Sequence, residues 1–358
     1  MEIETDRADR ACQSLLTRAG MSSRNANIVA SAMIAADKRG ITSHGIRQLP
    51  RYLDAFDLGA IDPAAEPRVV HRRGATAVID AGHGLGHPAA SFGMTEAIDR
   101  AEKLGVGVSV IRNSNHFGAA FYYALQASER GMIGFVTTSA VPVMAPFGGA
   151  DVAIGNNPLA WALPTESGAP VLLDMACSVG ARGKIRRAAI EGQRIPRDWA
   201  LDRDGRPTDD PNEALKGVLA SAAGPKGYGL AVVNELLSGG LSDSNMLGRI
   251  PDEVVRSDRF ERSMDVGHFV MALNISALIG LDTFLANAEW VRSELVGVRP
   301  AAGTDRVRLP GDIENDRFQS AERSGRITVD PSTLRQLGEL LEDASLQVPS
   351  DWLGVEAD

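Results

Sequence analysis

The segment Ser43-His44-Gly45 places a histidine beside a hydroxyl at the expected start of a helix. The positive end of a helix dipole lowers the pKa of a nearby imidazole and favours its neutral form, whereas a bound carboxylate has the opposite effect. A histidine that titrates near neutral pH is well suited to general acid–base catalysis. A capping serine followed by a surface histidine would give the same pattern, so these residues alone leave both interpretations open.

A second polar segment, residues 113–118, reads Asn-Ser-Asn-His-Phe-Gly and follows an apolar stretch that is typical of a strand. The carboxyl ends of strands commonly carry ligand-binding side chains. His116 is therefore a second candidate for acid–base chemistry, and an ordinary polar turn is the alternative.

Residues 82–86 resemble part of a dinucleotide-binding loop, because glycines recur between an expected strand and an expected helix. The third glycine of that fingerprint would stand where the chain has His87, so we interpret the segment as a tight glycine turn. His83 and His87 have the spacing of metal ligands on a helix, but Pro88 and the glycines disfavour a regular helix and no third ligand is nearby in sequence. We expect no metal site, and a metal-dependent hydrolase that uses these histidines is the alternative from another functional class.

The composition argues against several functional classes. The 358 residues carry a net charge of −9, which disfavours a nucleic-acid partner or an anionic membrane surface. The two cysteines, Cys12 and Cys177, form neither a disulfide framework nor a zinc pattern, which fits a reducing compartment. The first residues are acidic where a signal peptide is basic, and the longest apolar stretch, residues 266–281, is too short and too polar to span a bilayer. We expect a cytoplasmic protein.

Helical patterning at both ends of the chain flanks a body that mixes strands and helices. The helices expected at the ends cover about residues 6–19, 22–40, 42–59 (capped by Thr42 or Ser43) and 283 onward, with one extended piece at 326–329. The body is expected to contain a hairpin at 68–80, strands at 106–111, 132–138, 171–175 and 269–273, and helices at 88–103, 118–130, 226–237 and after the cap Asp210. This pattern predicts an α/β (α+β) fold, with a helical domain of residues 1–66 plus 283–358 and an α/β domain of residues 67–282.

Six segments, in order along nearly the whole chain, resemble motifs of the malate/L-lactate dehydrogenase type 2 family, which includes ureidoglycolate and sulfolactate dehydrogenases and piperideine-2-carboxylate reductases. The segments are Asp37–Gly45, Val106–Gly118, Gly155–Pro158, Leu173–Ser178, Pro225–Leu230 and Leu309–Asp312. Six matches in one order are far more specific than any single match.

The resemblance implies a fold other than Rossmann, in which a largely antiparallel mixed sheet, flanked by helices, binds NAD or NADP in the 67–282 domain. It also implies a homodimer and an oxidoreductase that transfers hydride between the cofactor and a small 2-oxo or 2-hydroxy carboxylic acid. A reductase of cyclic imines such as piperideine- or pyrroline-2-carboxylate is the alternative on the same scaffold.

The resemblance further assigns roles to residues of this chain. His44 would donate a proton to the substrate with Ser43 beside it, and Asp174 would orient the ring or balance its charge. His116 matches a histidine that has the acid–base role in some members, so both histidines remain candidates. The residues expected at the cofactor are Ser139, Asp174, Met175, Lys184, Lys226, Gly311 and Asp312, and those expected at the substrate are Arg47, Gln48, Arg51, Met144 and Asn156.

Two positions depart from the family pattern. Gln48 stands where the family has an arginine that clamps the substrate carboxylate. A shift of one residue turns a helical side chain by about 100°, so Arg47 would face elsewhere, while Arg51 lies one turn further along. Asn156 replaces a usual threonine. The substrate therefore does not carry over from a relative, and a non-catalytic relative that keeps the cofactor site is a further alternative.

Overall fold

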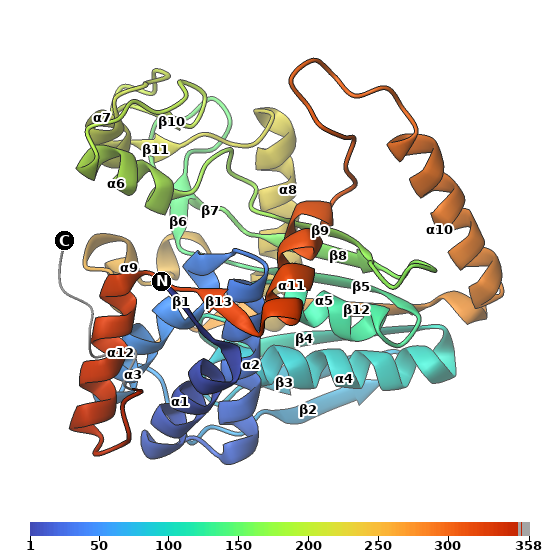
Figure 1. Ribbon diagram of the computed structural model, residues 1–358, viewed down its shortest axis with the longest axis horizontal. Coiled ribbons are helices and arrows are strands. Elements are labelled where there is room, and N and C mark those ends of the chain that lie inside the picture. The colour runs from blue at the N-terminus through green and yellow to red at the C-terminus, as the bar shows by residue number, and fades with distance from the viewer. Residues whose placement is uncertain (350–351, 353–358) are drawn as a thin grey trace.

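The computed structural model describes residues 1–349 and 352, and a seven-stranded sheet lies at its centre (Figure 1). The strand order is β2-β3-β4-β12-β5-β8-β9. Within this sheet β3 and β4 pair in parallel and every other neighbouring pair is antiparallel. The strands are β2 (Arg68–Arg73), β3 (Thr76–Asp80), β4 (Val106–Ser114), β5 (Met132–Thr138), β8 (Leu159–Leu163), β9 (Val171–Met175) and β12 (Val266–Asn274).

Twelve α-helices surround the sheets of the described chain. They are α1 (Thr5–Arg18), α2 (Ser23–Lys38), α3 (Leu49–Asp57), α4 (Gly86–Leu104), α5 (Phe121–Ser128), α6 (Arg182–Ile190), α7 (Pro211–Lys216), α8 (Pro225–Glu235), α9 (Glu253–Arg256), α10 (Leu281–Val296), α11 (Asp312–Ser324) and α12 (Pro331–Asp343).

Successive side chains of a strand point to opposite faces of the sheet. The central strands of the large sheet are buried on both faces, because helices pack apolar side chains against each of them. Val136 and Val270 join an apolar cluster with residues of α4 and α5 on one face. Their neighbours Phe135 and Phe269 join a second cluster, to which α6 and α8 contribute, on the other face. The sheet is thus a middle layer between helices.

A smaller sheet, in the order β10-β11-β6-β7, lies beside α6 and α7 in a separate lobe (Figure 1). Its strands are β6 (Pro142–Met144), β7 (Ile154–Gly155), β10 (Ala200–Leu201) and β11 (Val218–Leu219). The chain enters this lobe from β5, returns to the large sheet for β8 and β9, enters the lobe again at α6 and leaves it through α8.

The two ends of the chain pack together. β1 (Glu2–Glu4) pairs antiparallel with β13 (Arg326–Thr328). Residues of α1, α2 and α3 share an apolar cluster with residues of α12, and parts of the segment 250–266 join it. Among the described residues no helix is long and apolar enough to cross a membrane.

The third predicted helix, from Thr42 to Gly59, does not form as one piece, and this expectation is wrong. Two 3-10 turns, Thr42–His44 and Ile46–Gln48, precede α3, and no side chain caps it. The reason is a tertiary contact: Oδ2 of buried Asp37 accepts the N–H of Ile46 at 2.8 Å. A backbone group that bonds to another element leaves the regular helical pattern.

Most other predicted elements form with shifted ends. The strands at 132–138 and 171–175 have the predicted limits, and Ser22 and Asp210 cap α2 and α7 through their side chains. The helix predicted over 118–130 is shorter, because it covers only Phe121–Ser128. Strand β8 was not predicted from the sequence.

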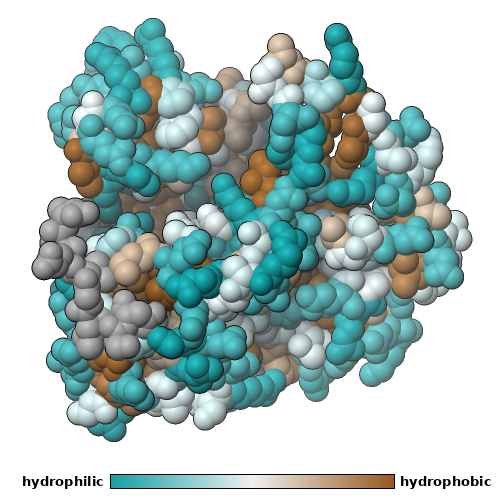
Figure 2. All heavy atoms as spheres, in the orientation of Figure 1, coloured by the Kyte–Doolittle hydropathy of each residue, from teal (hydrophilic) through white to brown (hydrophobic). Residues whose placement is uncertain are grey.

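Helix α10 stands at the edge of the molecule, and residues 297–311 lead from it back to α11 (Figure 1). None of its 16 residues is buried. Trp290, Val291 and Leu295 are exposed on it, and hydrophobic atoms are visible beside this helix in Figure 2. The apolar side chains of α10 are therefore largely uncovered in the single chain.

Candidate active site

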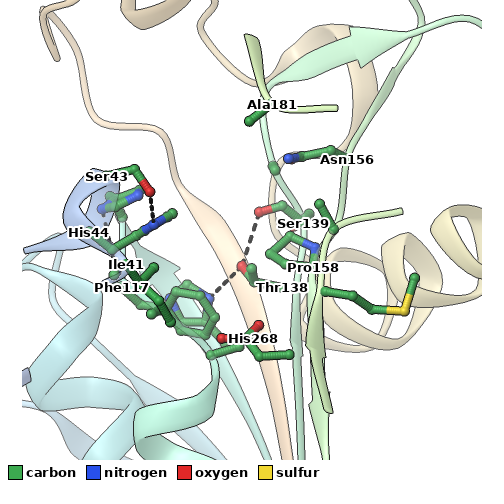
Figure 3. A pocket seen from close by; sticks show the side chains of 18 of the residues that line it. Ile41, Ser43, His44, Phe117, Thr138, Ser139, Asn156, Pro158, Ala181 and His268 are labelled. Carbon is green, nitrogen blue, oxygen red and sulfur yellow. Dashed lines mark hydrogen bonds between the residues drawn. The ribbon is translucent and has the colours of Figure 1, made fainter. Parts of the chain in front are cut away.

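A cavity of about 420 Å³ lies between the His44 segment and the ends of strands of the large sheet (Figure 3). Ser43 and His44 lie on one side of it, and Ser139 and Asn156 lie on the opposite side. His116 also lines this cavity. The segments that the sequence singled out separately therefore meet at one place.

His44 ends the first 3-10 turn, and its Nδ1 lies 2.9 Å from Oγ of Ser43. Burial, and then the charge of Arg51, lowers the pKa of His44 to about 4. The expected direction of this shift is confirmed, but the expected cause is wrong, because no α-helix begins at His44. The ring is neutral at pH 7 in the free chain.

The ring of His116 stacks on that of His44, with centroids 5.6 Å apart and planes inclined by 11°. Its Nδ1 lies 2.7 Å from the hydroxyl of Tyr52 and accepts the N–H of Gly118 at 3.4 Å. Burial, and then the charge of neighbouring histidines, beginning with His44, lowers the pKa of His116 well below its usual value. Two neutral imidazoles therefore face one cavity.

Five further predicted residues line the same cavity: Ser139, Asn156, Asp174, Met175 and Lys184. Oδ2 of Asp174 accepts the N–H of the first residue of α5 at 3.3 Å, and burial raises the pKa of Asp174 to about 6. Among the described residues no hydrogen bond joins Asp174 to His44 or His116. A role of this carboxylate at the rings would therefore act through its charge.

Four of the five residues expected at the substrate do not line the cavity. Gln48 is buried; its Nε2 donates to the carbonyl of Ser43 at 2.5 Å and its Oε1 accepts from Arg51 Nη1 at 2.9 Å. Arg47 is exposed, and Met144 is fully buried in β6. Of the five residues expected at the substrate, Asn156 is therefore the one that lines the cavity.

Arg51 occupies the position between the histidines and the segment before β12. Its guanidinium lies 4.9 Å from the ring centroid of Phe260 and pairs with the carboxylate of Asp258 at 3.4 Å. The Phe260 ring in turn lies 5.7 Å from that of His116. Arg51 is thus a cation next to the imidazole pair, although it does not line the cavity.

The Pro310-Gly311-Asp312 turn supports the cavity indirectly. A Cβ on Gly311 would lie 2.7 Å from Cβ of Leu172 in β9, and the residue adopts a φ of +90° that favours glycine. Oδ2 of Asp312 accepts the N–H of Leu309 at 2.9 Å. This tight turn against β9 starts α11, whose Glu314 lines the cavity.

His268 is a cavity residue that the sequence analysis missed. It is fully buried in β12, with Nδ1 2.7 Å from Oγ1 of Thr138 and Nε2 2.7 Å from Oγ of Ser114. Burial lowers its pKa to about 3. A lone histidine in an apolar strand is the only sequence signal for this residue, and such histidines usually belong to the core. Glu314, likewise missed, stands in a polar helix with no distinguishing pattern.

His83 and His87 do not come together. His83 is exposed, with Nδ1 2.7 Å from Oδ1 of Asp265. His87 is fully buried in α4, which begins at Gly86 although the sequence disfavours a helix there. Over residues 1–349 and 352, no group of three or more His, Cys, Asp or Glu side chains could hold a metal ion. The sequence-based metal-site alternative therefore has no support in this geometry.

A second cavity, of about 540 Å³, adjoins the first and shares Met175, Ala176, Ala181 and Lys184 with it. Its other walls come from residues 178–180, which precede α6, from residues 222–223, which precede α8, and from the carboxylate-bearing Asp198. Small side chains leave this space open, and helix N-termini and lysine favour anions. The joined cavities fit an elongated ligand with phosphate groups. Lys226 is exposed in the first turn of α8, outside both linings.

A family model described as malate/L-lactate dehydrogenase matches residues 3–338. The chain is 36% identical over 336 residues to L-sulfolactate dehydrogenase of Methanocaldococcus jannaschii, which covers 93% of this chain and 94% of the relative. It is 32% identical over 333 residues to NAD(+)-dependent ureidoglycolate dehydrogenase of Escherichia coli K12, which covers 92% and 93%.

Solved structures give the same result. Sulfolactate dehydrogenase from M. jannaschii superimposes with a TM-score of 0.91 at 34% identity, covering 99% of this chain and 100% of the other. Δ1-Piperideine-2-carboxylate reductase from Pseudomonas syringae has a TM-score of 0.84 at 27% identity, covering 95% and 99%. The chain is an oxidoreductase that belongs to the malate/L-lactate dehydrogenase family.

Proposed function

We propose that this chain transfers hydride between NAD or NADP and a small 2-oxo or 2-hydroxy carboxylic acid. The observation that carries this proposal is the stacked pair of neutral imidazoles, His44 and His116, on the wall of one cavity. Proton exchange with the substrate oxygen must accompany hydride transfer, and an imidazole is the usual group for that task. Relatives named as L-sulfolactate and malate dehydrogenases support the substrate class.

The cofactor would extend through both cavities. Ser139, Asp174 and Met175 would border its nicotinamide end, because they line the cavity that holds the two imidazoles. Lys184 and the first turn of α6 would meet its phosphates, with Lys226 nearby at the start of α8. We also propose that the cofactor-binding unit is not of the Rossmann type, which agrees with the single parallel pair in the large sheet.

The chemistry divides between the cofactor and the chain. When bound, the nicotinamide supplies or accepts the hydride. The imidazole pair exchanges the proton, and Ser43 Oγ orients His44 through its Nδ1. A substrate carboxylate beside the ring raises the pKa of His44 from about 4 towards the working pH, because a nearby anion favours the charged form. Catalysis in both directions then becomes accessible near neutral pH.

We propose Arg51 as the cation that attracts the substrate carboxylate. Its charge reaches both imidazoles, since it contributes, after burial, to the lowered pKa of His44 and of His116. Gln48 holds the guanidinium from behind. Arg47 is exposed and would not take part, Asn156 would contact the substrate, and Met144 would support the wall as a core residue.

Reduction of a cyclic imine is the second candidate, because the piperideine-2-carboxylate reductase has a closely similar fold. Oxidation of NADH and of NADPH should be followed with a panel of 2-oxo acids and 2-carboxylate imines. We expect turnover of 2-oxo acids, and His44→Ala should lower kcat at least about 100-fold while the Kd of the cofactor stays similar. Turnover of neither substrate class would contradict the proposal, and turnover of imines alone would favour the alternative.

We further propose a homodimer. A 16-residue helix with no buried residue gains little from its own chain, and helices of that length are marginal alone in water. Leu230, Val233 and Leu236, three residues apart along α8 and its end, are exposed as well. A second copy that covers α8 and α10 would bury both surfaces.

The domain division at residue 66 and the compartment are also proposals. The apolar cluster shared by α1, α2, α3 and α12 supports a helical unit of residues 1–66 and 283–358 beside the 67–282 unit. Buried, unpaired Cys12 and Cys177 are compatible with a cytoplasmic location.

A further inference from the structure

The hydrogen bonds at Nδ1 of His116 define which ring nitrogen carries the proton. The backbone N–H of Gly118 points to this nitrogen at 3.4 Å, and an amide N–H can only donate. Nδ1 must therefore present its lone pair. The hydroxyl of Tyr52, only 2.7 Å from the same atom, is then the principal donor to this one lone pair, which the more distant N–H of Gly118 shares.

Tyr52 is well suited to act as a permanent donor. Its side chain is fully buried, and its ring lies edge-on to that of His87 and stacks on that of Phe260. Burial raises the pKa of Tyr52 far above its usual value, so its hydroxyl keeps its proton at any working pH. The ring contacts fix the direction in which this hydroxyl points.

With Nδ1 occupied as an acceptor, neutral His116 carries its proton on Nε2. Within residues 1–349 and 352, Nε2 has no hydrogen-bond partner and is not among the buried unpartnered atoms, and His116 lines the cavity. The ring therefore offers an N–H to whatever occupies the cavity. It cannot take a second proton at Nδ1 without breaking the bond from Tyr52.

His44 differs from His116 in this respect. Its Nδ1 meets Oγ of Ser43 at 2.9 Å, and a hydroxyl can rotate to donate or to accept. The tautomer of His44 is therefore not fixed. This imidazole can gain or lose a proton at Nε2 without losing its hydrogen bond.

We propose that Tyr52 is a positioning residue that locks His116 as an N–H donor to the substrate 2-oxygen, which leaves proton transfer to His44. In the oxidation direction the substrate O–H bond breaks and its proton moves to Nε2 of His44, the hydride on the same carbon would leave to the oxidised nicotinamide, and the N–H of His116 stabilises the charge that develops on the oxygen. In reduction the same proton returns to the oxygen. This assignment rests on the proposed function.

The tautomer can be tested without substrate or cofactor. Nitrogen-15 NMR of the full chain, labelled at histidine and assigned with His116→Gln, should show His116 with a bare Nδ1 and a protonated Nε2. Tyr52→Phe should convert this signal to a mixture of tautomers. Tyr122→Phe is the control, because its hydroxyl is hydrogen-bonded to Ser31 and not, within the described chain, to the segment that holds His116, and the His116 tautomer should not change. A protonated Nδ1 in the wild-type chain would overturn the proposal.

Kinetics test the division of roles. If His116 only donates a hydrogen bond, His116→Ala should lower kcat about 100-fold, and the amide of His116→Gln should restore about tenfold of that loss. His44→Gln should be as inactive as His44→Ala, because an amide does not exchange a proton. The opposite pattern, with activity retained by His44→Gln and not by His116→Gln, would refute the assignment. A chain with the expected tautomer that turns over no hydroxy acid would instead contradict the proposed function alone.

Discussion

The backbone of Gly45 packs against the carboxyl group of Asp37, and this contact fixes the conformation of the segment that carries His44. A Cβ at Gly45 would lie 1.9 Å from Oδ1 of Asp37, and the N–H of Ile46 binds Oδ2 of the same group. The sequence identified Ser43-His44-Gly45 as a motif, but not why glycine is needed. The reason is the buried carboxyl, which is nine residues before Ile46 in sequence and comes close only after folding.

The charge of Asp37 makes the stability of the chain depend on pH. Burial raises the pKa of Asp37 to about 7, so between about pH 4 and 7 the folded chain holds a proton that the unfolded chain has lost. Stability therefore falls as pH rises through this window, by about 1 kcal/mol per unit. Asp37→Asn keeps an acceptor for Ile46 and removes the titration.

We expect Asp37→Asn to match the wild-type free energy of unfolding near pH 4.5 and to exceed it by about 2–3 kcal/mol at pH 7.5. Urea titrations of both proteins at several pH values measure this difference. A difference that stays constant with pH would show that Asp37 remains ionised throughout.

Gln48 joins the histidine segment to the cation behind it, through Ser43 and Arg51. Gln48→Leu removes both hydrogen bonds, so that the Arg51 guanidinium is left with its contacts to Asp258 and Phe260. A hydrogen bond to a charged group contributes about 1.5–3 kcal/mol, so the KM for a 2-oxo acid should rise about tenfold or more while the Kd of NAD(P)H is unchanged. Lys184→Met should instead raise the Kd of NAD(P)H and leave the KM for the 2-oxo acid unchanged, because Lys184 would meet the cofactor phosphates. An unchanged KM in Gln48→Leu would show that Gln48 does not hold Arg51 in place for substrate binding.

At the scale of elements, the sequence predicted the helices and strands whose limits are set by residues close to them in the chain. Ser22 and Asp210 cap helices through their own side chains, and the strand at 132–138 has the predicted limits. The continuous helix after Thr42 failed because a side chain of α2 binds the backbone of Ile46. Strand β8 reads Leu-Ala-Trp-Ala-Leu, an apolar run without a period that could equally belong to a buried helix.

Close packing of α5 on β5 depends on Gly134. A Cβ there would lie 2.2 Å from the carbonyl oxygen of Ala124, which is backbone and cannot move cheaply. Gly134→Ala should therefore lower the free energy of unfolding by about 1–3 kcal/mol, as overpacking does. Gly183→Ala is the control, because Gly183 is helical and a Cβ there meets open space. This variant should be as stable as the wild type or more stable by up to about 1 kcal/mol. Equal stability of both variants would show that α5 shifts freely on the sheet.

At the scale of the whole molecule, the cavity unites segments that the sequence presents far apart. Ser43, His116, Ser139, Asp174 and Lys184 reach it from five different elements or their connections, and the motifs predicted their importance without predicting their proximity. Periodicity indicates which face of an element is buried, but not which elements meet. For that reason His268 could not be told from a core residue, and Arg51 could not be placed behind the wall.

The uncovered apolar surfaces of α8 and α10 lead to the last prediction. Exposed apolar side chains at Val233, Leu236 and Trp290 form surfaces that a monomer would leave in water. We expect a dimer at micromolar concentration, and Leu236→Glu should shift it towards monomer in sedimentation velocity, because a buried unpaired carboxylate costs several kcal/mol. Ile190→Glu is the matched control, since Ile190 is 81% exposed on α6, outside these surfaces, and should leave the dimer intact. A wild-type chain that sediments as a monomer would mean that the exposed faces of α8 and α10 need no second copy.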